Sequence, residues 1–82
     1  MIADLEAEGL TVAEWTDEPS THYPPHAHRR DEVLVVLDGS MTMVVEGIER
    51  RLGPGDRLEL PAGARHTATV GPAGARYLVG RR

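Results

Sequence analysis

The sequence predicts an all-β fold, arranged as a small antiparallel sandwich or barrel. Residues typical of turns recur at short intervals along the 82-residue chain. Several of the short segments between these turns alternate apolar and polar residues with the period of a strand. Many short strands joined by regular turns are typical of antiparallel sandwiches and barrels.

The segments between the turns predict one helical turn and several strands. Residues 4–8 can form a single turn of helix, which Gly9 ends. Residues 33–37, Val-Leu-Val-Val-Leu, are apolar on both faces and therefore predict a central strand. Three other segments alternate and predict strands with one buried face: 41–46, 48–52 and 57–60.

The predicted turns are marked by proline, glycine and acidic residues, which favour the backbone angles of chain reversals. They are Pro24-Pro25, Asp38-Gly39, Glu46-Gly47, Gly53–Asp56, Pro61–Gly63 and Gly71–Gly74. Each is expected to separate two strands.

The whole chain, residues 1–82, is expected to form a single domain, because it is too short for a second core. A chain of this size buries only about 60% of the surface that its unfolded form exposes. We therefore expect a homodimer, in which the acidic N-terminal segment 1–20 pairs across the interface through the strand around Thr11. Residues 80–82 are expected to fray.

The composition excludes several kinds of chemistry and partner. The chain has neither cysteine nor lysine, which excludes thiolate ligands, a cysteine nucleophile and a lysine Schiff base. Acidic and basic residues are mixed after residue 25 and aromatic residues are scarce, so we expect no nucleic-acid partner. Neither a signal peptide nor a membrane-length apolar run is visible, so we expect a cytoplasmic protein with no membrane partner.

The histidine-rich stretch before the central strand predicts a metal site. His26 and His28 are two residues apart, so in a strand both project to the same face. Glu32 keeps this parity if the strand continues or carries a compensated irregularity, and His66 follows the distant turn at residues 61–63. Three imidazole nitrogens and one carboxylate suit a divalent transition metal. The alternative is that these are independent structural or surface residues.

At these positions the sequence resembles the cupin superfamily, and in particular its small single-domain microbial members. The first cupin motif, H-x-H-x(3,4)-E-x(6)-G, corresponds to His26, His28, Glu32 and Gly39. The second, G-x(5)-P-x-G-x(2)-H-x(3)-N, corresponds to Gly55, Pro61, Gly63 and His66. Two positions depart from the pattern: Ser20 replaces a glycine before the first motif, and Val70 replaces the final asparagine.

The resemblance implies a cupin-like jelly-roll barrel with one divalent transition metal per chain. Its ligands would be His26, His28, Glu32 and His66, with one or two coordination positions open for water or substrate. The donor set does not select among iron, manganese, nickel, copper, cobalt and zinc. Glu32 is expected to bind the metal, and its alternative role is that of a catalytic base.

An open metal site of this kind indicates a metal-dependent enzyme that acts on a small polar molecule. The expected reaction is that of an oxygenase, hence an oxidoreductase, or that of an isomerase or lyase. The alternative is a non-catalytic module that binds a metal or a small molecule without turnover.

Further residues are weaker candidates for the substrate pocket. They are His22, Met41, Met43, Leu58 and Tyr77. For the two methionines and the leucine, the alternative is an ordinary place in the core. For Tyr77, the alternative is that it seals a barrel end or a dimer interface.

Metal binding is expected to weaken in acid. Imidazoles, whose reference pKa is about 6.5, then bind protons in competition with the metal. Titration of the protein with metal at neutral and acidic pH measures the difference. An affinity that does not change between the two would contradict histidine ligation.

Overall fold

The computed structural model describes residues 1–82, which form one short helix followed by strands. The elements are α1 (Ile2–Ala7), β1 (Thr11–Asp17), β2 (His22–His26), β3 (Glu32–Val45), β4 (Ile48–Leu52), β5 (Arg57–Leu60) and β6 (His66–Arg81). The helix begins before the predicted turn and is followed by Gly9, whose positive φ ends it. No helix has both the length and the apolar character needed to cross a membrane.

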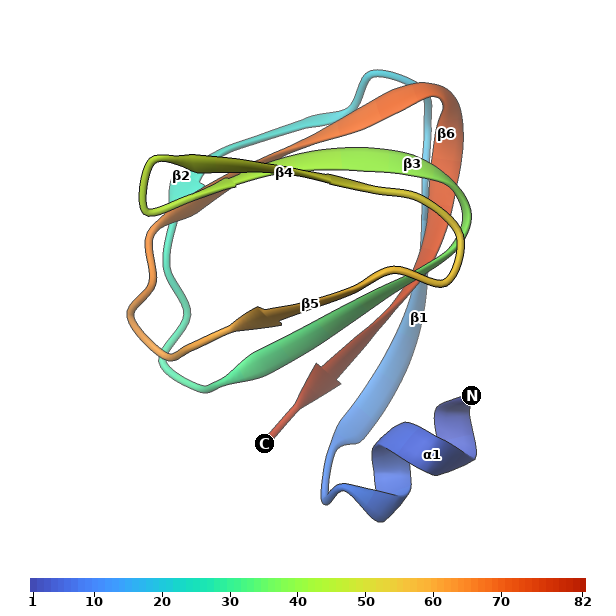
Figure 1. Ribbon diagram of the computed structural model, residues 1–82, viewed down its shortest axis with the longest axis vertical. Helices are drawn as coiled ribbons and strands as arrows, with labels where there is room; N and C mark the ends of the chain where they lie inside the picture. Colours follow the sequence, from blue (N-terminus) through green and yellow to red (C-terminus); the bar gives the residue numbers. More distant parts are fainter.

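The strands form an antiparallel sheet around two long members, β3 and β6, which confirms the all-β prediction. Both long strands bend and take part in two facing layers (Figure 1). One layer has the order β1-β6-β3-β5, and the other has the order β2-β6-β3-β4. The sheet does not close into the predicted barrel, because each outer strand pairs only with β3 or β6 and no ladder joins the outer strands. The arrangement is consistent with a jelly roll.

Two predicted turns are instead bends inside the long strands. Asp38-Gly39 lies within β3, where the register with β6 shifts on both sides of it, and Gly71–Gly74 lies within β6. Pro24-Pro25 likewise lies within β2, at another register shift. A bulge needs the same permissive backbone as a turn but bends the strand without reversing it. The remaining predicted turns do separate strands, as expected.

The apolar segment 33–37 lies in β3 between β5 and β6, which confirms it as a central strand. Leu34 and Val36 point into a core cluster between the two layers. Val33 and Val35 point to the opposite face, where they pack with Leu5 of α1. Both faces of this segment are therefore buried, which explains the absence of alternation.

The two ends of the chain lie side by side in the sheet. Strand β1 pairs with β6 of the same chain, from Thr11 opposite Arg81 to Asp17 opposite Ala75. Gly80 and Arg81 belong to β6, and the fraying of residues 80–82 stays a prediction. A Cβ on Gly80 would lie 3.0 Å from the Leu10 side chain, so glycine permits this close approach.

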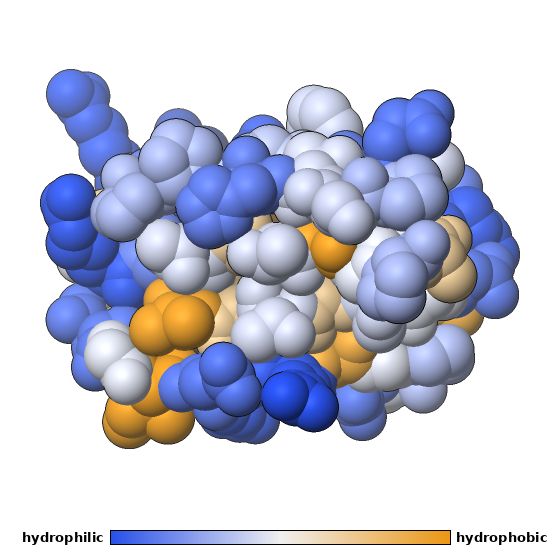
Figure 2. All heavy atoms as spheres, turned by 90° about the horizontal axis from the view of Figure 1, so that it is seen from above, coloured by the Kyte–Doolittle hydropathy of each residue, from blue (hydrophilic) through white to orange (hydrophobic).

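The predicted homodimer stays a prediction. Because one edge of β1 pairs with β6, only its outer edge is left for pairing with a second chain. The face drawn in Figure 2 is mostly hydrophilic, and hydrophobic residues appear on it in small separate groups. The large apolar side chains that are exposed come from different elements: Met1, Ile2, Trp15 and Ile48.

Replacing Gly39 by alanine is expected to destabilise the fold strongly. Gly39 has a φ of 76°, and a Cβ there would collide with the backbone carbonyl of Gly74. Gly55→Ala is the matched control, because Gly55 also has positive φ but open space around it. We expect the control to cost about 1 kcal/mol and Gly39→Ala about 1–3 kcal/mol more, measured by urea unfolding. Equal losses would show that the bend does not depend on the close approach.

Candidate metal centre

Three histidines converge on one point at the edge of the sheet. His26 ends β2 and lies directly opposite His66, the first residue of β6. His28 follows two residues after β2, in the loop that leads to β3. One ring nitrogen from each histidine lies within 4.8 Å of those of the other two. This spacing allows one metal ion to contact all three side chains.

Backbone carbonyls fix the protonation of two of these rings. His26 Nδ1 lies 2.7 Å from the carbonyl oxygen of Pro24, and His66 Nδ1 lies 3.0 Å from that of Ala64. A carbonyl oxygen can only accept, so each Nδ1 must carry and donate the proton. In the neutral ring, Nε2 then keeps its lone pair. Such a bond to the outer nitrogen is how metal-binding histidines are oriented in proteins.

The loop that carries His28 is held against the turn after β5. The backbone amide of Gly63 donates to the His28 carbonyl at 2.9 Å, and that of Ala62 donates to Asp31 Oδ1 at 2.7 Å. The strand does not continue from His28 to Glu32, because residues 27–31 leave the sheet and form an irregular segment between them. His28 and Glu32 are therefore brought together by the loop and not by strand parity.

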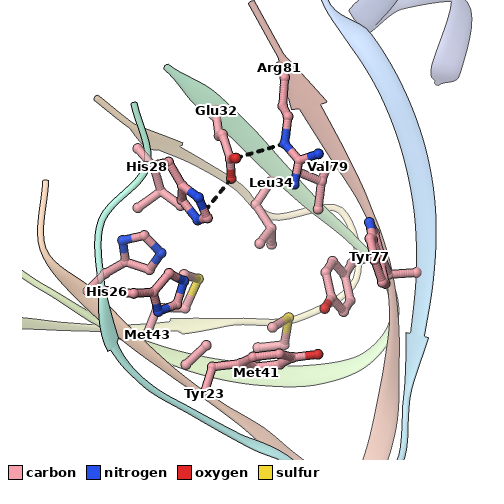
Figure 3. Close-up of a pocket in the computed structure, with 14 residues that line it drawn as sticks. Tyr23, His26, His28, Glu32, Leu34, Met41, Met43, Tyr77, Val79 and Arg81 are labelled. Atoms are coloured by element: carbon pink, nitrogen blue, oxygen red, sulfur yellow. Dashed lines mark hydrogen bonds and ion pairs between the residues drawn. The ribbon is translucent and has the colours of Figure 1, made fainter. Parts of the chain in front are cut away.

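Glu32 lies beside the histidines but is held by an arginine. Its Oε1 is 3.5 Å from His28 Nε2, and its Oε2 accepts a hydrogen bond from Arg81 Nε at 2.9 Å. Figure 3 shows this carboxylate between the two side chains. The close group of potential ligands contains only the three histidines. The sequence interpretation missed Arg81, because only the pairing of β6 with β3 places it opposite Glu32.

Burial favours the neutral form of His28. Loss of solvent lowers the pKa of His28, and His26 and His66 act in the same direction, while the nearby Glu32 carboxylate opposes them. The lowered pKa increases the neutral fraction of His28 at pH 7, and a neutral imidazole is the form that binds metals.

The histidines, Glu32 and Arg81 lie at one side of a cavity of about 290 Å³ between the two layers. The rest of its wall is mostly apolar. The aliphatic lining residues are Leu34, Met41, Met43, Leu60, Ala68 and Val79. The only tryptophan and both tyrosines of the chain, Trp15, Tyr23 and Tyr77, also line it. Such a cavity suits a small molecule that is partly apolar.

Two phenols share one carboxylate behind the cavity wall. Tyr23 and Tyr77 both donate to Asp17 Oδ2, at 2.8 and 2.6 Å. Burial is the main cause that raises the pKa of each tyrosine, and the hydrogen bond to Asp17 adds to it. Both phenols therefore keep their protons at neutral pH.

The structure separates the weaker pocket candidates. Met41, Met43 and Tyr77 line the cavity. His22 does not, because its ring turns to Thr69 Oγ1, at 2.9 Å, on the exposed side of β2. Leu58 packs in the core and also lies outside the cavity, whereas Leu60, two residues later, lines it. Neither His22 nor Leu58 lines this cavity, and the assignment of substrate-pocket residues stays a prediction.

Comparison with known proteins agrees with this geometry. The family described as "Cupin domain" matches residues 13–79, a span that includes all three histidines, Glu32 and both motifs. The chain belongs to the cupin family. The resemblance predicted from the two motifs is thus confirmed.

Several known cupins are similar to this one. Over 71 residues it is 31% identical to dimethylsulfoniopropionate lyase DddW of Ruegeria pomeroyi, a match that covers 87% of this chain and 45% of that protein. The structure of dimethylsulfoniopropionate lyase DddQ from the same organism is 31% identical with a TM-score of 0.82, covering 89% of this chain and 38% of that one. Polyketide cyclase RemF from Streptomyces resistomycificus is 32% identical with a TM-score of 0.76, covering 88% and 53%. This cupin therefore spans less than half the length of either lyase.

Replacing Asp17 by asparagine is expected to lower the pKa of both tyrosines. The carboxylate favours the protonated phenols, but burial remains, so both values should stay above their ordinary 10. In the wild type, the unfolded state loses these protons first, so stability should fall as pH rises above about 10. Tyrosinate absorbance against pH measures the shift. Glu18→Gln removes a neighbouring exposed carboxylate as a control, and an equal shift in it would contradict the role of Asp17.

Proposed function

We propose that this cupin binds one divalent transition metal through His26, His28 and His66. The observation that carries the proposal is the pair of Nδ1 bonds to backbone carbonyls, which leaves Nε2 of His26 and His66 as the nitrogen with a lone pair. Three neutral imidazoles are a donor set that transition metals accept. The ion would supply Lewis-acid chemistry, polarising an oxygen of a bound substrate.

We assign Glu32 the role of the catalytic base. Its carboxylate lines the cavity and is buried, and Arg81 holds one oxygen while the other faces His28. A carboxylate in such a place can accept a proton from a carbon next to a polarised carboxyl or carbonyl group. The tyrosines are poor bases, because both phenols keep their protons and donate them in hydrogen bonds to Asp17.

The reaction that we propose is a lyase-type elimination on a small molecule. Glu32 would take a proton from the substrate, the electron pair of that C–H bond would form a double bond, and the leaving group would depart from the next carbon with its bonding pair. Support comes from the similarity to two proteins named dimethylsulfoniopropionate lyases. None of the named relatives is an oxygenase, so nothing favours the oxidoreductase expectation.

A non-catalytic binding module is the second candidate. It needs only the three histidines and the cavity, which would serve binding without a catalytic base. Such a module would bind the metal and a small molecule with the same residues but release the molecule unchanged.

Two substitutions are expected to separate metal binding from chemistry. His26→Ala should lower metal affinity at least about 100-fold, since it removes a direct ligand. Glu32→Gln should keep the metal and lose most elimination activity. Metal content is measured on untagged protein purified without chelator or nickel resin, and elimination is measured as the volatile sulfide released from dimethylsulfoniopropionate.

His22→Ala is the matched control, because this histidine lies outside the cavity. The same metal content in His22→Ala and His26→Ala would contradict the proposed centre. Loss of metal in Glu32→Gln would make this residue a ligand. Metal binding and ligand binding without any product would favour the binding module.

A further inference from the structure

Arg81 has unused hydrogen-bond donors on the cavity wall. Its Nε donates to Glu32, whereas Nη1 and Nη2 make no hydrogen bond within the chain. Figure 3 shows the guanidinium beside Leu34 and Val79, with its terminal nitrogens turned away from Glu32. Arg57 and Arg76 differ, because their terminal nitrogens pair with carboxylates on the surface. Arg81 thus carries a site for a further acceptor.

Besides the histidines, two ionisable residues of opposite charge line the cavity: Glu32 is the anion and Arg81 is the cation. The hydroxyl groups of Tyr23 and Tyr77 already donate their hydrogen bonds to Asp17, so these phenols offer only acceptor lone pairs to a ligand. An anionic group would therefore be repelled or left unpaired at the tyrosine end. It can be satisfied at the end where Arg81 and the histidines lie.

We propose that Arg81 binds the carboxylate of an anionic substrate in the cavity, on the terminal nitrogens that face away from Glu32, and so selects acids over their neutral analogues. A guanidinium presents parallel N–H groups that match the two oxygens of a carboxylate. This inference deepens the proposed function and rests on it for the reacting group, but the recognition itself needs only Arg81.

A carboxylate fits this position better than a phosphate does. Glu32 offsets the charge of Arg81, so the pair carries no net positive charge that would favour a doubly charged anion over a singly charged one. The side chain of Arg81 is half exposed, so a small ligand can reach the terminal nitrogens by displacing water. The cavity of about 290 Å³ suits a short-chain acid.

The test compares propionate with propionamide, which has a similar shape and no charge. Binding to the full chain is measured by calorimetry, first as purified with its metal content known and then after dialysis against a chelator. We expect the wild type to bind propionate at least about tenfold more tightly than propionamide. Arg81→Gln should abolish this preference, and Arg50→Gln, an exposed arginine on β4, should preserve it.

Glu32→Gln provides a sharper prediction. It removes the negative charge that competes for Arg81, so propionate should bind more tightly than to the wild type. Arg81→Lys keeps the charge without the parallel donors and should weaken propionate binding partially. This variant decides the matter if Arg81→Gln does not fold.

Several results would overturn the inference. These are no preference for propionate in the wild type, an unchanged preference in the folded Arg81 variants, or weaker propionate binding in Glu32→Gln. A preference that depends on Arg81 in protein that binds no metal would leave the inference standing while refuting the proposed centre. If His26→Ala loses the metal but the preference for propionate does not depend on Arg81, the proposed metal centre stands and the inference about Arg81 is refuted.

Discussion

The antiparallel pairing of β3 with β6 is the constraint on which the rest of the structure depends. These two strands supply the inner positions of both layers, and every other strand pairs with one of them. Because β6 bends, its first residue, His66, and its last, Arg81, both reach the same cavity. The bend of β3 brings Glu32 and Met43 to that cavity from its two halves. The glycine at position 39 allows the two bent backbones to approach each other.

Polar groups are placed in this apolar cavity by pairing each of them with a fixed partner. Nδ1 of His26 and His66 is bound to backbone carbonyls, and the tyrosine hydroxyls are bound to Asp17. No buried side-chain nitrogen or oxygen lacks a hydrogen-bond partner. An unpaired polar group would be costly there, so these bonds both stabilise the fold and orient the site. The atoms that stay available, Nε2 of two histidines and the terminal nitrogens of Arg81, lie at one side of the cavity.

Much of the fold was predictable because it depends on local patterns. The apolar run in β3 and the alternating segments around it predicted the strands, since burial of one or both faces leaves a direct trace in the sequence. The bends at Asp38-Gly39 and Gly71–Gly74 were taken for turns, because glycine permits both conformations and only pairing with the partner strand distinguishes them. The sequence could not show that the sheet stays open for a related reason: closure into a barrel depends on whether distant outer strands meet.

The sequence by itself identified the family and singled out the three histidines that converge in the structure. Their spacing within two motifs reflects local geometry and turn chemistry, so it can be recognised without the fold. Only the tertiary structure decided what surrounds them. Glu32 meets Arg81 across forty-nine residues of chain, and the register of β6 on β3 sets that contact. His22 was excluded from the cavity, and Leu60 rather than Leu58 lines it. Which side chains of a strand reach the cavity depends on how the bent strands pair, and this information is held by the whole sheet and by no single segment.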